Sequence, residues 1–234
     1  KFRLCLDLRV VNSMTKFKNL HSHLVKGIEF LYARIKGMKV FTVIDMTKAY
    51  RSLIATEKLM KVCAFRTPGS TKYPFHTWAF RSTPDGLATL PGFYTYCIQK
   101  ALSPRSRQCT LNHIDDLLVA SPDWDTHLQD LESVFEDLLK GNFLISVPKL
   151  KLGKTEISFL GHVINGEVLK IPEDRKSYFD ALEPPTTKKE MQSLLGVAGY
   201  MAHFVDSYNL KTGPLFEALR GRSDKQKFTL NEIQ

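Results

Sequence analysis

Apolar and polar side chains alternate along several segments of the chain, which is the pattern of β-strands with one buried face. Residues 2–8 (FRLCLDL) place apolar side chains at every second position. Residues 39–45 (KVFTVID) combine β-branched and aromatic residues and predict a buried strand that ends on Asp45. Similar patterns predict a hairpin and two further strands of the main sheet, at 62–67 with 73–80, at 143–147 and at 157–164.

Between these strands the apolar residues follow helical spacing. The spacing predicts helices over 24–35, before Gly37, and from Thr89 to about Leu102. A third helix is predicted from Ser121 to Gly141, and the segment from Ser103 to Gln108 is predicted to be a basic loop. The apolar stripe of the third helix is expected to face the core, and its members are Leu128, Leu131, Phe135, Leu138 and Leu139.

The composition changes after residues 165–166 (Asn-Gly), since only helical patterns follow. They predict helices at about 172–182, 187–208 and 213–219. Thr187 and Glu190 have the spacing of a capping box, which marks the start of the second of these helices. The change predicts two domains, over residues 1–167 and 168–234.

Residues 111–121 (LNHIDDLLVAS) read as buried strand interrupted by Asp115 and Asp116. An ionised carboxylate removed from water costs several kcal/mol unless a cation or hydrogen bonds compensate it. The pair therefore either caps a turn that faces solvent or holds a metal ion. Taken alone the pair favours the turn, because Asp is a common turn former.

Asp45 adds a third carboxylate at the end of an apolar strand. Adjacent antiparallel strands would bring the three together, and clustered negative charges repel unless cations lie between them. Mg²⁺ suits this role, because it binds one or two carboxylates together with substrate phosphates. Two such ions would activate a primer 3′-hydroxyl and stabilise the leaving pyrophosphate. The carboxylates by themselves leave a polymerase, a nuclease and another metal hydrolase open.

Composition and charge narrow the choice of partner. The 234 residues are 43% hydrophobic, which is typical of a globular chain, and 33 Lys and Arg against 24 Asp and Glu give a net charge of +9. Residues 1–44 alone hold nine basic and two acidic side chains. A basic chain favours an anionic partner. No amphipathic basic helix or long apolar run favours a membrane, so nucleic acid is the expected partner.

Six motifs stand in order along nearly the whole chain. They are residues 3–9 (RLCLDLR) with Asn12, 41–50 (FTVIDMTKAY), 84–86 (PDG), 113–116 (HIDD), 159–162 (FLGH) and 184–219. This series resembles the reverse transcriptases of retroviruses and long-terminal-repeat retroelements. The resemblance implies an α+β right-hand polymerase fold, with fingers and palm around an antiparallel sheet with packed helices over 1–167. An all-helical thumb would follow over 168–234.

The resemblance also implies roles for single residues. Asp45 and Asp115 would ligate two Mg²⁺ ions, which Mn²⁺ could replace, with Asp116 supporting the site and the main chain of Met46 facing a metal. The implied nucleotide-binding residues are Arg3, Lys48, Ala49, Tyr50 and Asp85. Arg3 would clamp the triphosphate, and Tyr50 would exclude a 2′-hydroxyl beneath the incoming sugar. The implied primer-binding residues are His113, Ile114, Leu160 and Gly161.

The implied function is an RNA-directed DNA polymerase that extends a primer on an RNA or DNA template with deoxynucleoside triphosphates. Two positions depart from the family pattern. Asp85 stands where retroviruses have Gln and adds a negative charge beside the nucleotide. His113 stands where the family has Tyr and is smaller and titratable near neutral pH. These departures leave open a catalytically weak, retroelement-derived module that binds nucleic acid.

The chain opens at Lys1 in the middle of a strand pattern, with neither an initiator Met nor a signal peptide. We therefore expect it to be a piece of a longer pol polyprotein that ends near the start of a connection region. The expected location is intracellular, in the cytoplasm or in virus-like particles.

Overall fold

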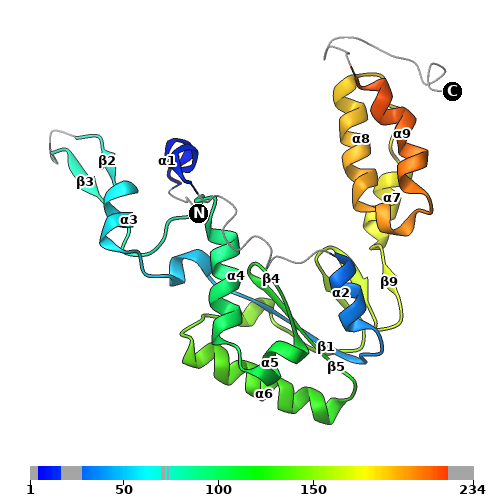
Figure 1. Cartoon of the computed structure of the whole chain (residues 1–234), viewed down its shortest axis with the longest axis horizontal. Coiled ribbons are helices and arrows are strands. Elements are labelled where there is room, and N and C mark those ends of the chain that lie inside the picture. Colours follow the sequence, from blue (N-terminus) through cyan, green and yellow to red (C-terminus); the bar gives the residue numbers. More distant parts are fainter. Residues whose placement is uncertain (1–4, 17–27, 70–71, 73, 221–234) are drawn as a thin grey trace. The chain divides into compact units, whose positions relative to one another are not determined.

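A computed structural model of the chain describes residues 5–16, 28–69, 72 and 74–220. The chain divides into two compact units, Lys1–Leu169 (unit 1) and Lys170–Gln234 (unit 2). Unit 1 combines helices with antiparallel strands, whereas the described part of unit 2 is almost entirely helical (Figure 1). None of the described helices has the length and apolar character that a membrane span requires.

The core of unit 1 is a four-stranded antiparallel sheet in the order β4-β5-β1-β6. Its strands are β1 (Val40–Asp45), β4 (Thr110–His113), β5 (Asp116–Ser121) and β6 (Lys151–Lys154). The strand predicted at 39–45 and the strand–turn–strand predicted at 111–121 are both confirmed. Because β1 lies between β5 and β6, its carboxyl end meets the start of β5 inside the sheet.

The two faces of this sheet pack against different elements, since alternate residues of a strand point to opposite faces. One face packs on the hairpin of residues 157–164 through Phe41, Val43, Leu118, Ile157, Phe159 and Ile164. The other packs on α4 (Leu90–Ala101) and α6 (Trp124–Lys140) through Ile44, Leu117, Val119, Tyr94, Ile98, Val134 and Leu138 (Figure 1). Burial of each such side chain contributes about 1.5–3 kcal/mol, so both faces hold the sheet in place.

Helix α6 confirms the third predicted helix, with Asp123 as its N-cap. The fully buried apolar residues of this helix are Leu131, Val134 and Leu138, fewer than predicted, and the polar residues His127, Asp130 and Asp137 are buried as well. Leu128 is 62% exposed and Leu139 is 78% exposed, so the prediction that they face the core was wrong. A helix that covers one sheet face buries only a limited stripe, and these two residues lie outside it.

Helix α5 (Pro104–Cys109) occupies the segment that the sequence predicted to be a loop. Ser103 caps the helix by accepting the amide of Ser106 at 3.3 Å, and Pro104 suits the first helical position. The buried carboxylate of Asp137, from α6, accepts the Ser103 amide at 2.7 Å and the Ser106 hydroxyl at 2.6 Å. The loop prediction was wrong because this tertiary partner stabilises the first turn.

A second sheet contains β7 (Ile157–Phe159), β8 (His162–Ile164) and β9 (Leu169–Lys170). The segment 157–164 is therefore a hairpin of its own and not a strand of the main sheet. Residues 143–147 were also predicted wrongly, because Ile145 makes only an isolated bridge to Met46. The amide of Phe143 bonds to the carbonyl of Leu138 at the end of α6, which holds this segment against the helix. Strand β6, which was not predicted, pairs with β1 instead.

Residues 5–8 do not form the strand predicted for 2–8. The Asp7 carboxylate accepts the main-chain amide of Arg9 at 3.1 Å and turns the chain into α1 (Arg9–Met14). Leu8 is buried with Cys63 and Leu90. An alternating pattern alone does not supply the neighbouring strand that a ladder needs, and the described part of the chain provides none here.

The helix predicted before Gly37 and the hairpin predicted within residues 62–80 are both present in unit 1. Helix α2 (Ile28–Ile35) ends before Gly37, and β2 (Phe65–Thr67) pairs with β3 (His76–Trp78) as a short antiparallel hairpin. Helix α3 (Glu57–Val62) was not predicted. It begins where the Thr56 hydroxyl accepts the amide of Leu59 at 3.3 Å.

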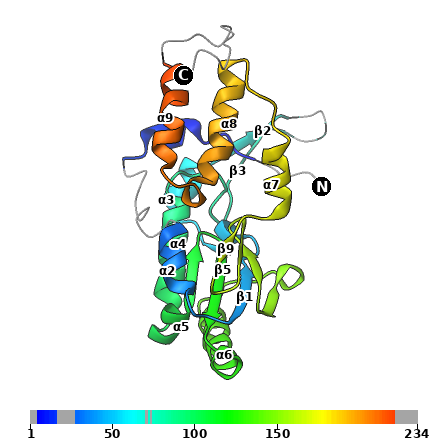
Figure 2. The ribbon, with the colours of Figure 1, turned by 90° about the vertical axis from the view of Figure 1, so that its right-hand side faces the viewer.

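Unit 2 contains α7 (Glu173–Asp180), α8 (Lys188–Tyr200), η4 (Ala202–Phe204) and α9 (Tyr208–Ala218). The predicted capping box of Thr187 and Glu190 is confirmed at the start of α8. Figures 1 and 2 show α8 and α9 side by side, and Met191, Leu195 and Leu215 pack between them. Helix α8 ends at Tyr200, before the predicted end at residue 208. Helix α9 begins at Tyr208, before the predicted start at residue 213.

Candidate active site

The predicted carboxylate pair lies at the turn between β4 and β5. Asp115 is a turn residue and Asp116 is the first residue of β5. The carbonyl of Asp115 accepts the amide of Met46 at 3.0 Å, which ties this turn to the end of β1. Ile114 has a φ of 59°, in the left-handed region that β-branched residues avoid. Backbone strain of this kind is concentrated at functional sites.

Asp45 lies directly beside the turn. It is the register partner of Asp116, and His113 is the partner of Asp116 on the other side. Directly opposed residues of antiparallel strands point to the same face, so the three side chains form a row. Asp45 and Asp116 line a cavity of about 390 Å³, together with Lys149 and Leu160.

The electrostatics of the row follow from this crowding. Burial raises the pKa of Asp116, and the charges of Asp115 and Asp45 raise it further. Lys149, the last residue of η3 (Val147–Lys149), places its Nζ 3.0 Å from Oδ2 and 3.3 Å from Oδ1 of Asp45. Its ammonium therefore supplies a positive charge to the carboxylate cluster.

The donor atoms of this cluster fit a divalent metal ion. Among the described residues, no three His, Cys, Asp or Glu side chains are grouped so that they could enclose an ion by themselves. Mg²⁺ does not require such a cage, because it binds one or two carboxylates plus substrate phosphates. Asp45 already holds a cation, the Lys149 ammonium, against its carboxylate. The site therefore suits an ion that arrives together with a phosphate ligand.

The chain turns sharply just after Asp45. Lys48 has a φ of 51° and begins the short helix η2 (Ala49–Ser52). The Ser52 hydroxyl donates to the carbonyl of Ala49 at 2.6 Å and closes this turn. The left-handed Lys48 thus redirects the main chain immediately beside the carboxylates.

Tyr50 follows this turn and is fixed by contacts on two sides. The Thr83 hydroxyl donates to its carbonyl, and its ring meets that of Tyr94 edge-on with centroids 5.7 Å apart. Burial raises the pKa of Tyr50, and Asp115 and Asp85 raise it further. Tyr50 therefore lies within electrostatic reach of both the turn at Asp115 and the 84–86 turn.

The 84–86 turn is held by two side chains. Asn12 donates to the carbonyl of Gly86 at 2.8 Å and accepts the amide of Ala88 at 2.9 Å. Arg51, from η2, places Nη2 3.0 Å and Nε 3.1 Å from Oδ2 of Asp85. The charge that distinguishes Asp85 from the Gln of the family pattern is thus paired in this chain.

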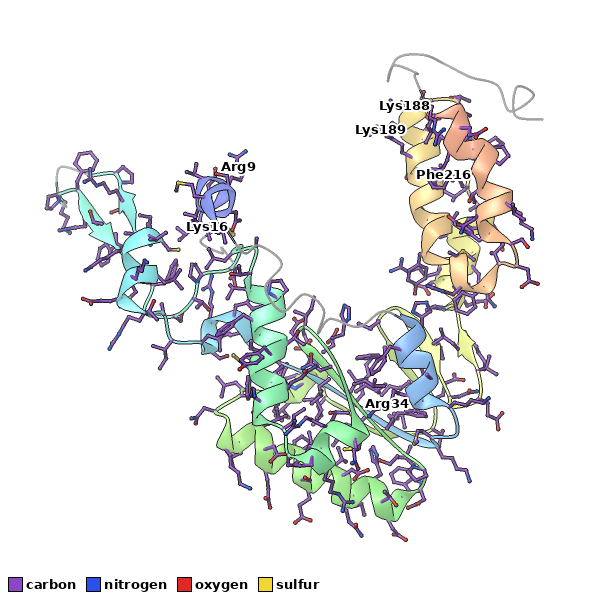
Figure 3. The ribbon with its side chains drawn as sticks, in the orientation of Figure 1. Arg9, Lys16, Arg34, Lys188, Lys189 and Phe216 are labelled. Carbon is purple, nitrogen blue, oxygen red and sulfur yellow. The ribbon has the colours of Figure 1, made fainter. Side chains whose placement is uncertain are left out.

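Leu160 and Gly161 form the turn between β7 and β8. Their φ values are 49° and 78°, and a type I′ hairpin requires positive φ at both central positions. Leu160 lines the carboxylate cavity and also a second cavity of about 220 Å³, which His113 lines as well. Arg34 reaches from α2 into the wall of the second cavity and donates to the main chain of α5 at 3.3 Å (Figure 3). Two of the expected primer-binding side chains therefore share one cavity.

Several strained backbone positions coincide with expected site residues. Among the described residues, positive φ at non-glycine positions occurs at Lys48, Ile114, Asn142, Leu160 and Ser207. Three of these, Lys48, Ile114 and Leu160, are residues that the sequence assigned to the site. Such conformations cost about 1–3 kcal/mol each and persist only where the surrounding structure imposes them.

A family model described as "Reverse transcriptase (RNA-dependent DNA polymerase)" matches residues 1–164. The chain belongs to the reverse transcriptase family. It is 26% identical to the Retrovirus-related Pol polyprotein from transposon opus of Drosophila melanogaster and 26% identical to the Gag-Pol polyprotein of Walleye dermal sarcoma virus. These alignments cover 99% and 100% of the chain but only 23% and 13% of the two polyproteins. This reverse transcriptase chain thus spans less than a quarter of either relative.

Solved structures match this reverse transcriptase chain along its length. A foamy viral protease-reverse transcriptase in complex with double-stranded DNA gives a TM-score of 0.79 at 23% identity, over 100% of this chain and 40% of that one. A foamy viral protease-reverse transcriptase in complex with an RNA/DNA hybrid gives a TM-score of 0.77 at 24% identity, over 99% of this chain and 31% of that one. The predicted α+β polymerase fold is confirmed.

Two charged residues that contact expected site residues were not singled out from the sequence. Lys149 reaches Asp45 and Arg51 reaches Asp85 across 104 and 34 residues of chain, respectively. The nearest sequence signal for Lys149 is a pair of lysines among apolar residues at 147–151 (VPKLK). Arg3, which the resemblance assigns to the triphosphate, lies outside the described residues.

The raised pKa of Asp116 predicts how stability depends on pH in a metal-free buffer with EDTA. The ionised carboxylate is less stable in the folded than in the unfolded chain, so stability falls as pH rises above the unfolded value of about 3.9. We expect Asp116→Asn to unfold a few degrees above the wild type at pH 7, with the difference shrinking towards pH 4. Thermal unfolding across this range measures it. Glu132→Gln, at an exposed position of α6, should show no such trend, and a difference independent of pH would contradict the prediction.

Proposed function

We propose that this chain is the polymerase part of an RNA-directed DNA polymerase, which adds deoxynucleotides to a primer 3′-hydroxyl. The observation that carries the proposal is the register of Asp45 with Asp116 beside the strained turn at Asp115. Unit 1 would hold the fingers and palm, and unit 2 the thumb. Family membership supports the reaction class, and the cavity beside the carboxylates supports its location.

Asp45 and Asp115 would hold two Mg²⁺ ions, with Mn²⁺ as a substitute, and the main chain of Met46 would face one of them. When bound, the two ions would lower the pKa of the primer hydroxyl and neutralise the leaving pyrophosphate. Asp116 would keep the local potential negative and so favour metal binding. The Lys149 ammonium contacts Asp45 and would balance part of that charge.

The incoming deoxynucleoside triphosphate would bind along the turn that follows Asp45. The main chain at Lys48 and Ala49 would present amides to the phosphates, as in other anion sites. Tyr50 would lie beneath the sugar, and Asp85 would lie at the edge of the same pocket. Arg3 is proposed to clamp the triphosphate on the basis of the family resemblance alone.

The primer end would lie between the two hairpin turns. His113 is the last residue of β4 and Ile114 follows it in the first turn, and Leu160 and Gly161 form the second. His113 and Leu160 line the same cavity, which supports a common role. A buried Nδ1 of His113 has no hydrogen-bond partner in the described part of the chain and could serve a nucleic-acid ligand.

Template and primer would be held by charge as well as by shape. Basic side chains lie on both units, with Arg9 and Lys16 in unit 1 and Lys188 and Lys189 in unit 2 (Figure 3). The similar foamy viral structures contain double-stranded DNA or an RNA/DNA hybrid, which supports a duplex ligand here. The relatives support a place within a longer pol polyprotein.

The second candidate is a catalytically weak module that binds nucleic acid. His113 and Asp85 favour it, since both depart from the family pattern. Primer extension on poly-rA with oligo-dT and dTTP, in Mg²⁺ or Mn²⁺, separates the two candidates. Extension by the wild type supports the polymerase, whereas tight template binding without extension under any condition supports the module. Degradation of nucleic acid in the absence of nucleotides would instead support a nuclease.

Replacing Tyr50 tests the proposed sugar contact. We expect Tyr50→Ala to raise incorporation of ribonucleotides relative to deoxynucleotides by roughly 100-fold, equivalent to about 2.7 kcal/mol of discrimination. The ring would no longer collide with a 2′-hydroxyl. Single-nucleotide extension with dTTP and UTP measures the ratio. Tyr50→Phe keeps the ring and should keep the discrimination; its loss in this control would refute the steric explanation.

A further inference from the structure

We propose that Arg51 is a positioning residue for nucleotide binding, because its ion pair with Asp85 cancels the negative charge that Asp85 brings to the nucleotide pocket. The inference rests on the proposed function, in which Asp85 lies at the edge of that pocket. It assigns a role to a residue that no motif identified.

The geometry of the pair is constrained at both ends. Two guanidinium nitrogens of Arg51 approach one carboxylate oxygen of Asp85, at 3.0 Å and 3.1 Å. The same guanidinium lies over the ring of Phe80, 5.5 Å from its centroid, and Phe80 packs on Phe65 with centroids 5.6 Å apart. An arginine between a carboxylate and an aromatic face has little freedom to leave either.

The main chain also keeps the two residues in register. The amide of Ala55 donates to the carbonyl of Arg81 at 3.0 Å, and the amide of Thr83 donates to the carbonyl of Leu53 at 2.9 Å. Ile54 and Ser82 form the bridge between these bonds. The short ladder follows Arg51 and precedes Asp85, so it fixes the distance across which their side chains meet.

The location of the pair points to a role in binding. Arg51 and Asp85 are 37% and 58% exposed, and an ion pair this accessible adds little to folding stability. Arg51 adjoins Tyr50 in sequence, and the charge of Asp85 reaches the Tyr50 hydroxyl. A triphosphate that enters this region meets a neutral pair with Arg51 in place and an extra negative charge without it.

Four variants of the full chain test the proposal: Arg51→Gln, Asp85→Asn, the double variant, and Arg81→Gln as control. Arg81 is exposed, and its replacement removes the same charge near the same ladder. Kinetics of single dTTP incorporation on poly-rA/oligo-dT give KM and kcat separately. A dideoxy-terminated primer cannot be extended. With this primer, the dTTP concentration needed to stabilise the ternary complex reports nucleotide binding separately from the reaction.

We expect Arg51→Gln to raise the KM for dTTP, and the dTTP concentration needed for the ternary complex, about tenfold. Its kcat should stay within about twofold of the wild type, and the double variant should recover most of the lost affinity. Arg81→Gln should leave the KM within about twofold.

Three results would overturn the inference. They are an unchanged KM in Arg51→Gln, a double variant as defective as Arg51→Gln, and a fall in melting temperature that accounts for the weaker binding. A wild type that neither extends the primer nor forms the ternary complex would instead overturn the proposed function, and with it this inference. A wild type that is active while Arg51→Gln behaves normally would overturn the inference alone.

Discussion

Asp115→Asn is expected to lower primer extension by at least about 10³-fold, which corresponds to roughly 4 kcal/mol of lost transition-state stabilisation. Asn has the size of Asp but lacks the charge that would hold a divalent ion, so the substitution tests charge and not packing. Asp115 lies in the turn between β4 and β5, and its link to Met46 uses the main-chain carbonyl, which the substitution retains. Folding should therefore be preserved.

The measurement is single-nucleotide extension under enzyme excess, beside a filter-binding assay for template and primer. Binding should stay within about twofold of the wild type, because the bulk of the affinity for nucleic acid comes from phosphate contacts. Asp125→Asn, at an exposed position in the first turn of α6, serves as the matched control and should retain activity. Near-normal extension by Asp115→Asn would exclude a metal-binding role for this carboxylate.

Gly166→Ala is expected to destabilise unit 1 by about 3 kcal/mol, the largest stability effect that we predict. Gly166 has a φ of +82°, and a Cβ there would lie 1.7 Å from the carbonyl oxygen of Met38. The carbonyl of Gly166 also accepts the amide of Gly37 at 2.9 Å. The clash would push this turn off the segment that leads into β1, whose far end carries Asp45.

Thermal unfolding followed by tryptophan fluorescence isolates this effect, because both tryptophans, Trp78 and Trp124, lie in unit 1. A loss of this size lowers the melting temperature by roughly 6–12 °C. Gly37→Ala is the control, since Gly37 has nearly the same φ, +81°, with nothing within 4 Å of an added Cβ. Gly37→Ala should lower the free energy of unfolding by only about 1–2 kcal/mol, which is the usual cost of alanine in the left-handed region. Equal losses in the two variants would rule out the clash as the cause.

Elements with strong local signals were predicted well. The strand at Val40–Asp45 combines β-branched and aromatic residues in the middle of the main sheet, and the capping box at Thr187 starts α8 as expected. The local sequence is sufficient to predict these elements, because the side chains that determine their structure are close neighbours in sequence. The same holds for the turn at Asp115, where two strand patterns flank the carboxylates.

Elements that depend on distant partners were predicted poorly. Residues 5–8 have the alternation of a strand but no strand beside them in the described structure. The segment from Pro104 to Cys109 has no helical pattern, but the buried Asp137 binds its first turn from α6. Residues 143–147 look like a strand, yet β6 pairs with β1 instead. In each case a contact remote in sequence outweighed the local preference.

The sequence by itself determined the family, the three carboxylates at or beside strand ends and the turn at Asp115, because these are properties of neighbouring residues and of their order. Only the tertiary structure showed that residues 157–164 form a hairpin whose turn is Leu160 and Gly161. Only the tertiary structure decided which charges meet: Lys149 on Asp45, and Arg51 on Asp85. Such pairs join residues far apart in the chain, and a charged side chain carries no local signal of its partner. The sequence alone presents Asp85 as an unbalanced negative charge, whereas in the structure Arg51 neutralises this charge.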